Sequence, residues 1–453
     1  MKPSILWTTL AAGFLVRLAA FFLIDFSFDN DVFTFQMWAI RVFEYGFAEF
    51  YVGDTFTDYP PVYMYVLYLV GWAQSVFRWS PLNIWFNFVT FLPAIICDLL
   101  IGYVLGRKFY SHASVRGKFS FLCIAAWIFN PAVILISSIW GQVESVFSLM
   151  LLLSLILLRQ KRLLPAYVLF GLAIVTKPQS LFLGPVYLYS AFEFLKNPMI
   201  YERFRFEKFR TSSVFSKKQN HESIDTSIIE RVWLFVFAAA AGVGAIVLVS
   251  LPFGLELTIR QIFFGMDLYQ FASVNAFNFW ALVGGNWQPL YLTFLGISYG
   301  IWGIGIVLVI IGGSLFALHV DAARHGGQHF YLIAAFLFVI IFVFSVRMHE
   351  RYLFPGLLFL LVYGIDRRNY RLIHAVTGTD SVVKPHAYRI IWGFYAAFSV
   401  TYFVNCFEIL RWLRSGLNVG VFAGSLQVVS FINVVLGCMM IIFLCISIRR
   451  AGS

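Results

Sequence analysis

Charge is what this sequence has least of. Only 12% of its 453 residues are Asp, Glu, Lys or Arg, whereas a soluble globular domain carries about 25%. Hydrophobic residues make up 60% of the chain and aromatic residues 19%. So little charge cannot cover a water-soluble surface of this size, which excludes soluble, disordered and fibrous proteins. The composition predicts an all-α polytopic membrane protein built from apolar helices of about 20 residues.

Cysteine is also scarce, and its placement indicates no chemistry. All five cysteines lie in or beside apolar runs, at Cys97, Cys123, Cys406, Cys438 and Cys445. They form no CxxC pair, and no His/Cys cluster has the spacing of a metal site. The cysteines therefore indicate neither a disulfide scaffold nor a cysteine-based metal site, and we interpret them as small apolar residues.

The few charges are unbalanced, with 33 Lys and Arg against 22 Asp and Glu, giving a net charge of +11. In a soluble protein this excess would suggest nucleic acid as a partner. In a polytopic membrane protein, basic residues gather instead in cytoplasmic loops that face anionic lipid. We therefore expect membrane lipids, and no nucleic acid, among the partners.

The apolar runs predict about twelve transmembrane helices. By residue number they are 5–24, 84–106, 119–139, 142–158, 162–176, 180–195, 232–251, 290–318, 329–346, 350–364, 389–410 and 419–447. The run at 5–24 is long enough for a retained span rather than a cleaved signal. With the N-terminus inside, each basic cluster falls on the cytoplasmic side: 107–118, 159–162, 196–231, 367–371 and 449–450.

This orientation requires residues 62–78 to lie on the outer face without crossing the membrane. Their aromatic residues suit an interfacial helix. The chain is then one membrane domain, 1–453, with a long first outer loop at 25–83 that contains interfacial helices. Residues 196–231 form the longest cytoplasmic loop, and the spans within 366–453 have no assigned role.

Polar residues in the first outer loop are candidates for chemistry. Asp29 and Asp31 follow the first span, and Asp58 and Tyr59 precede two prolines. A carboxylate held at the membrane boundary under apolar cover has restricted water and can act as a base. The alternative is that Asp29 or Asp31 caps a helix that begins near Val32, because Asp is a favoured N-cap residue.

Two further polar segments fall at outer junctions between spans. Gln142 and Glu144 follow Trp140, and at such depth polar residues usually face an interior cavity. Helix capping or hydrogen bonds between helices are the alternative. Lys177, followed by Gln179, lies on the non-cytoplasmic side, where lysine is uncommon, and its charge favours an anionic partner. That anion is either a phosphate or a carboxylate such as Glu144 or Glu350.

The joint at 344–355 concentrates charge between two apolar runs. Arg347, His349, Glu350 and Arg351 lie within five positions of one another. Arginine and histidine are suited to hold a phosphate and to stabilise the charge that develops as it leaves. A structural ion-pair network is the alternative. A weaker segment, 275–287, mixes amides with aromatic residues and includes Asn278 and Trp280.

Taken in order, these motifs resemble the GT-C superfamily of polytopic glycosyltransferases. The sequence is similar to bacterial proteins related to glycosylphosphatidylinositol mannosyltransferases, and to glucosyltransferases that use lipid-phosphate-linked glucose. The resemblance covers about residues 5–365. It rests on Asp31 with Trp38, DYPP at 58–61, WGQ-x-E-S at 140–145, TKPQ at 176–179, N-x-F-x-x-W at 275–280 and HERY-x-x-P at 349–355. Glu144 departs from the family's usual aspartate.

The resemblance implies an inverting hexosyltransferase of the GT-C fold in a bacterial cell membrane, with its active site on the outer face. The donor would be a hexose, mannose or glucose, on a polyprenyl phosphate, and the acceptor a glycolipid, a cell-envelope glycan or a protein. Asp31, or alternatively Asp29, would be the base. The donor phosphate would be bound by Arg351, His349, Lys177 and Arg347. The substrate-binding residues would be Asp58, Tyr59, Gln142, Glu144, Gln179, Asn278, Trp280 and Glu350. No cofactor is required, and a divalent cation is left open.

Two other classes of protein compete with this interpretation. A lipid-linked sugar flippase or transporter would also have twelve spans, and intramembrane charges such as Arg17 and Asp98 suit it. However, the ionisable clusters gather on one face, whereas alternating access uses a site at the midplane. A non-enzymatic assembly scaffold would have no need for Asp31, Lys177, His349 and Arg351.

Overall fold

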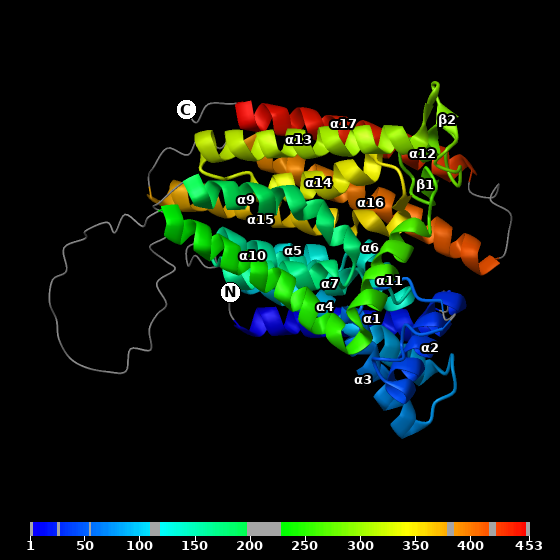
Figure 1. The fold of residues 1–453 in the computed structure, drawn as a ribbon. Helices are drawn as coiled ribbons and strands as arrows, with labels where there is room; N and C mark the ends of the chain where they lie inside the picture. Colours follow the sequence, from blue (N-terminus) through cyan, green and yellow to red (C-terminus); the bar gives the residue numbers. More distant parts are fainter. Residues whose placement is uncertain are drawn as a thin grey trace, which may run out of the picture.

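A computed structural model describes residues 3–24, 28–53, 56–108, 118–196, 228–377, 385–415 and 423–449. Most of the expected cytoplasmic loop at 196–231, residues 109–117 of the first basic cluster and Arg450 lie outside these residues. Long helices run side by side along one direction, and the shorter elements gather at one end of the bundle (Figure 1). The two described ends of the chain lie toward the opposite end of the bundle (Figure 1).

Helices account for nearly every described element of the bundle. They are α1 (Pro3–Leu23), α4 (Ile84–Lys108), α5 (Lys118–Ile128), α6 (Pro131–Ile134), the π-helix η2 (Leu135–Ile139), α7 (Glu144–Arg159), α8 (Leu163–Ile174), α9 (Gly184–Lys196), α10 (Ile228–Ser250), α13 (Tyr299–His325), α14 (Phe330–Phe344), α15 (Phe354–Thr377), α16 (Pro385–Ser415) and α17 (Ala423–Arg449).

Six described helices are long and apolar enough to cross a membrane: α1, α4, α10, α13, α16 and α17. The pair formed by α5 with α6 and η2, bent by 41°, makes a seventh if it is one span. These helices confirm an all-α, multi-pass membrane protein, and the count of twelve crossings stays a prediction. Helix α14 lies at the centre, because every residue from 331 to 343 is buried.

The shorter elements form a cap at the end of the bundle that carries the candidate site. They are α2 (Asp29–Tyr45), α3 (Val62–Phe77), α11 (Leu255–Asp267), α12 (Phe279–Leu282), the 3-10 helices η3 (Pro178–Leu183), η5 (Leu251–Phe253) and η6 (Glu350–Leu353), and the strands β1 (Ser273–Val274), β2 (Thr293–Phe294), β3 (Ile297–Ser298) and β4 (Met348–His349). Strands β1 and β4 pair in parallel, which ties the 273–275 segment to the charged joint at 347–351.

One predicted span begins too early. The run at 290–318 was expected to be helical throughout, but residues 293–298 form the β2–β3 hairpin and α13 begins at Tyr299. Leu295 and Gly296 turn the chain with positive φ angles of 51° and 79°. Leu295 in the turn is exposed, whereas Phe294 before it is half-buried. Periodicity alone cannot distinguish so short an apolar run from helix.

The two intramembrane charges pair with each other. Arg17 Nη2 lies 3.1 Å from Asp98 Oδ2, and both side chains are completely buried. Ser145 donates a hydrogen bond of 2.6 Å to the second carboxylate oxygen, and Arg17 also donates to the Ile128 carbonyl oxygen. The pair is therefore enclosed between helices.

Candidate functional site

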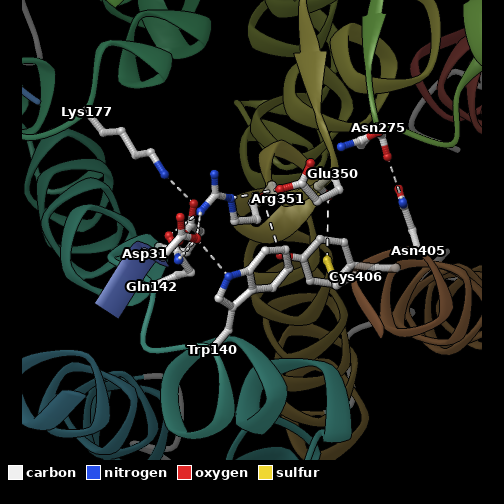
Figure 2. A network of polar contacts seen from close by, with 11 residues as sticks. Asp31, Trp140, Gln142, Lys177, Asn275, Glu350, Arg351, Asn405 and Cys406 are labelled. Atoms are coloured by element: carbon white, nitrogen blue, oxygen red, sulfur yellow. Dashed lines mark hydrogen bonds and ion pairs between the residues drawn. The ribbon is translucent and has the colours of Figure 1, made fainter. Parts of the chain in front are cut away.

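Asp31 lies in the first turn of α2 and is held by a different part of the chain. Its Oδ2 atom accepts hydrogen bonds of 2.9 Å from both Trp140 Nε1 and Gln142 Nε2 (Figure 2). The expectation that an aspartate caps a helix beginning near Val32 is wrong. The helix begins at Asp29, its N-cap residue is Phe28, and that cap makes no side-chain hydrogen bond.

The backbone around residue 141 explains how two neighbouring side chains reach one carboxylate oxygen. The π-helix η2 precedes it, and Gly141 then turns the chain with a φ of 73°. A Cβ atom at Gly141 would lie 2.3 Å from the ring of Phe91, so glycine is needed for space as well as for conformation. Single-turn π-helices are frequent at functional sites.

Arg351, on η6, completes the surroundings of Asp31. Its Nη1 atom donates to Gln142 Oε1 and lies 3.8 Å from Asp31 Oδ2, while its Nε lies 3.0 Å from Glu350 Oε1. The guanidinium carbon lies 5.2 Å from the centre of the Trp140 ring, a cation–π distance (Figure 2). Charged and polar groups from three separate segments thus converge on one carboxylate.

Helix α16 holds this joint from the other side, which the sequence did not indicate. The Tyr402 hydroxyl donates to the Arg351 carbonyl oxygen at 3.3 Å, and Cys406 Sγ lies 3.7 Å from the Glu350 carbonyl oxygen. Asn405 binds the backbone of the segment that follows β1, donating to the Asn275 carbonyl oxygen at 2.8 Å (Figure 2). An amide within an apolar helix was the signal that could have identified this role.

Lys177 is paired with a carboxylate. Its Nζ atom forms an ion pair with Glu144 Oε1, and the two side chains are 7% and 1% exposed. Of the partners that the sequence left open, the structure shows Glu144. Its side chain, one methylene longer than that of an aspartate, extends to the Lys177 ammonium. The ammonium also lies 5.5 Å from the centre of the Tyr59 ring. Burial lowers the pKa of Lys177, and the neighbouring Glu144 opposes that shift.

A cavity of about 280 Å³ lies directly beside this cluster. Asp31 does not line it, but Arg351, which contacts Asp31, does. Its walls come from the first loop, η3, α11 and the charged joint. The lining residues with polar side chains are Asp58, Tyr59, Lys177, Gln179, Gln261, Tyr269, Arg347, His349, Arg351 and Tyr352. Seven of the fourteen site residues predicted from the sequence therefore face one space.

Besides Lys177, two more titratable groups in this cavity have pKa values shifted toward their neutral forms. Burial, reinforced by Arg351 and Lys177, lowers the pKa of His349 well below its ordinary value of 6.5. The His349 ring is therefore a neutral hydrogen-bonding group near pH 7, and not the cation expected beside a phosphate. Burial also raises the pKa of the Asp58 carboxyl, although the cations Arg351 and Lys177 oppose that shift.

Arg347 and Gln179 each have a buried polar side-chain atom that forms no hydrogen bond with the described residues. Arg347 adopts a φ of 62°, and its Nη2 lies 3.5 Å from the exposed carboxylate of Asp267. Its Nε atom is buried without a hydrogen bond among the described residues, and so is the side-chain oxygen of Gln179. Unpaired buried polar atoms beside a cavity are available to a ligand.

The structure does not bring Asn278 and Trp280 to the cavity. Asn278 is fully buried, accepts a hydrogen bond from the Ala281 N–H and donates to the carbonyl oxygens of Phe342 and Ser345. The Trp280 indole donates to the Phe344 carbonyl oxygen at 2.9 Å. These contacts fasten α12 to the end of α14, so both residues have structural partners here.

Asp29 is exposed at the start of α2 and makes none of the contacts that hold Asp31.

Among the described residues, no three His, Cys, Asp or Glu side chains lie close enough to share a metal ion. The functional groups of the site are carboxylates, amides, arginines, the Lys177–Glu144 ion pair, one histidine and several tyrosines. Such a set can accept a proton at Asp31 and can bind an anion at Arg351.

Comparison with known proteins gives one partial likeness. No family model matches the chain. A stretch of 131 residues is 30% identical to GPI mannosyltransferase 1 of Dictyostelium discoideum. The match covers 27% of this chain and 29% of that protein's length, so each protein extends well beyond the shared stretch.

Proposed function

We propose that this chain is a membrane glycosyltransferase that moves a hexose from a polyprenyl-phosphate-linked donor to an acceptor on the non-cytoplasmic face. The observation that carries the proposal is the state of Asp31. One carboxylate oxygen is held by an indole and an amide, whereas Oδ1 accepts no hydrogen bond from the described residues. The side chain is 33% exposed, so Oδ1 is available to a substrate.

In the proposed reaction, the acceptor hydroxyl oxygen attacks C1 of the donor sugar. Its proton passes to Asp31 Oδ1, while the bond between C1 and the phosphate oxygen breaks and the electron pair leaves with the polyprenyl phosphate. Attack opposite to the leaving group inverts the anomeric carbon. The Trp140 and Gln142 donors fix the position of the base, and positioning of this kind typically contributes about 10²–10⁴-fold to the rate.

The departing phosphate is the second charge that the site must stabilise. Arg351 is the best-placed cation, because it lines the cavity and contacts Gln142, and its fork can bind two phosphate oxygens. Arg347 and Lys177 line the same cavity, and His349 would contribute as a neutral hydrogen-bond donor. Asp58, Tyr59 and Gln179 are the proposed contacts to the sugar, with Gln142, Glu144 and Glu350 supporting the cations.

The identity of the sugar is proposed from the partial likeness alone. The relative is named a mannosyltransferase, so mannose is the first donor to test and glucose the second. A glycolipid, a cell-envelope glycan and a protein are all retained as acceptors. No cofactor enters the proposed step.

Replacing the base tests the proposal. Purified protein is supplied with a synthetic polyprenyl-phosphate donor that carries a radiolabelled hexose, together with a membrane lipid extract as acceptor. We expect Asp31→Asn to lower turnover by at least about 10²-fold while its melting temperature stays near that of the wild type. Asparagine keeps an oxygen for Trp140 and Gln142 but cannot take the proton.

Asp29→Asn is the matched control, because it makes the same change two residues away at an exposed position. It should leave turnover near the wild-type value. Near-normal turnover of Asp31→Asn would overturn the assignment of the base. Uptake of the labelled donor into sealed vesicles without any transferred product would instead support a lipid-linked sugar transporter.

A further inference from the structure

A second cavity lies at the end of the bundle opposite to the candidate active site. Its volume is about 380 Å³. Its walls are formed by the end of α7 and the start of α8, by the last turns of α9 and α13, and by the start of α14. Helices α9 and α13 reach this end in Figure 1. No part of the proposed transfer reaction uses this cavity.

Four charged side chains line the second cavity, and two of them have strong partners. Arg159 Nη1 lies 3.2 Å from Asp366 Oδ2, and its guanidinium lies 5.0 Å from the centre of the Tyr331 ring. The Asp321 carboxylate accepts the His329 backbone N–H at 2.9 Å and lies 2.7 Å from His329 Nδ1. These groups are already satisfied within the protein.

Lys161 and Glu193 are the other two, and they remain open to a ligand. Both are half-buried, and neither forms an ion pair within 4 Å in the part of the chain that the structure describes. Burial lowers the pKa of Lys161, and Glu193 opposes that shift. An anion beside Lys161 would also favour its charged form. Glu193 lies next to the Tyr189 hydroxyl and offers a carboxylate in the same space.

One open cation and one open anion in the same cavity match a ligand that carries both charges. We infer that this cavity binds a phosphate ester bearing a primary ammonium group, with the phosphate at Lys161 and the ammonium at Glu193. This is the headgroup chemistry of an aminophospholipid such as phosphatidylethanolamine. A simple anion would be repelled by the half-buried Glu193 carboxylate, whose neighbours in the cavity are Lys161 and the Tyr189 hydroxyl.

Flanking surfaces favour a membrane lipid over a soluble phosphate ester. Helices α9 and α13 pack on each other, and both expose large apolar side chains near this end. Leu188 is 62% exposed, Phe192 52% and Phe316 65%. Exposed apolar surface on membrane helices faces acyl chains, so a lipid whose headgroup occupies the cavity would lay its chains along these residues.

Thermal stabilisation of the purified full chain by short-chain lipids tests the inference. The probes are dihexanoyl phosphatidylethanolamine, phosphatidylcholine and phosphatidylglycerol, together with free phosphoethanolamine. We expect phosphatidylethanolamine to stabilise at the lowest concentration. Lys161→Gln and Glu193→Gln should each raise its apparent dissociation constant about tenfold, because each removes a charge-assisted hydrogen bond. Lys161→Arg should retain most of the affinity.

Arg162→Gln is the matched control, because Arg162 is the next residue, carries the same charge, is exposed and does not line the cavity. It should leave the dissociation constant unchanged. Equal losses at Arg162 and Lys161, or equal affinity for phosphatidylglycerol and phosphatidylethanolamine, would overturn the inference. Equal affinity for free phosphoethanolamine would overturn the assignment of the source to a lipid.

Discussion

At the scale of single residues, the site depends on buried charges that compensate one another. Lys177 and Glu144 are both nearly inaccessible, so neither can lose its partner without leaving a buried charge unpaired. Removing one member of a buried pair typically destabilises a protein by about 3–5 kcal/mol, whereas replacing both by apolar residues is often nearly neutral. This asymmetry makes it possible to distinguish a role of Lys177 in ion pairing from a role in substrate binding.

We therefore predict that Lys177→Met lowers the free energy of unfolding by about 3–5 kcal/mol and that Lys177→Met with Glu144→Leu recovers most of this loss. Denaturant unfolding in detergent measures both. Turnover should remain low in the double variant, because the proposed donor phosphate still lacks Lys177. Recovered turnover together with recovered stability would remove Lys177 from the phosphate site.

The exposed pair Arg260–Glu256 provides the control for this experiment. Its atoms lie 2.6 Å apart, but the two side chains are 74% and 77% exposed. Solvent-exposed pairs contribute about 1 kcal/mol or less, so Arg260→Met should change stability by no more than that. A similar loss of unfolding free energy in Lys177→Met and Arg260→Met would show that burial of the pair does not determine its contribution.

The sequence indicated which residue types form the site but not how they pair. The order of polar segments at outer junctions placed Asp31, Gln142, Lys177 and Arg351 in one candidate site, and they do converge. The choice between Glu144 and a phosphate as the partner of Lys177 depends on the distance between α7 and η3, which no local pattern encodes. Asn405 was missed because its partner, the Asn275 carbonyl oxygen, is a backbone atom without a sequence signature.

At the scale of elements, the position of Asp31 depends on how α2 packs on α3. The two helices cross at Gly71, where a Cβ atom would lie 2.1 Å from the Ala39 carbonyl oxygen and 2.8 Å from Phe43 Cβ. Backbone and side-chain groups of α2 thus occupy the space that any larger residue at position 71 would need. Aromatic residues in 62–78 indicated an interfacial helix, but the close approach to α2 could not be seen from the sequence.

We predict that Gly71→Ala lowers both the melting temperature and the turnover, because α2 must shift and carry Asp31 away from Trp140 and Gln142. Gly244→Ala in α10 is the control, since nothing lies within 4 Å of a Cβ atom there. Because alanine has a higher helix propensity than glycine, Gly244→Ala should leave the free energy of unfolding unchanged or raise it by up to about 1 kcal/mol. Equal melting temperatures and turnover for the two variants would contradict the proposed dependence on this crossing.

Other elements show why local patterns were insufficient. The hairpin at 293–298 contains the same apolar residues as a span, and only the left-handed Leu295–Gly296 turn distinguishes it. Strands β1 and β4 have two residues each, and they exist because each provides the other with hydrogen-bonding partners. Pairing between distant short segments is a tertiary property, so the long apolar helices were predictable and this cap was not.

At the scale of the whole molecule, the two cavities lie at opposite ends of the helices and differ in the charge around them. The candidate active-site cavity lies under the cap, while Arg159, Lys161 and Arg162 lie at the other end. Basic residues collect on the cytoplasmic side of membrane proteins, so this distribution predicts that the second cavity faces the cytoplasm. The transfer reaction would then take place on the outer face, and the aminophospholipid would come from the inner leaflet.

Cysteine labelling tests this orientation. Tyr291 is 78% exposed next to the β2–β3 hairpin, and Arg162 is exposed at the opposite end. With a membrane-impermeant maleimide, Tyr291→Cys should be labelled in intact cells, whereas Arg162→Cys should be labelled only after permeabilisation. The wild-type chain measures the background from the native cysteines, of which Cys438 and Cys445 lie on the apolar helix α17. The reverse pattern would place Asp31 on the cytoplasmic face, where the proposed donor would have to present its sugar from the inner leaflet.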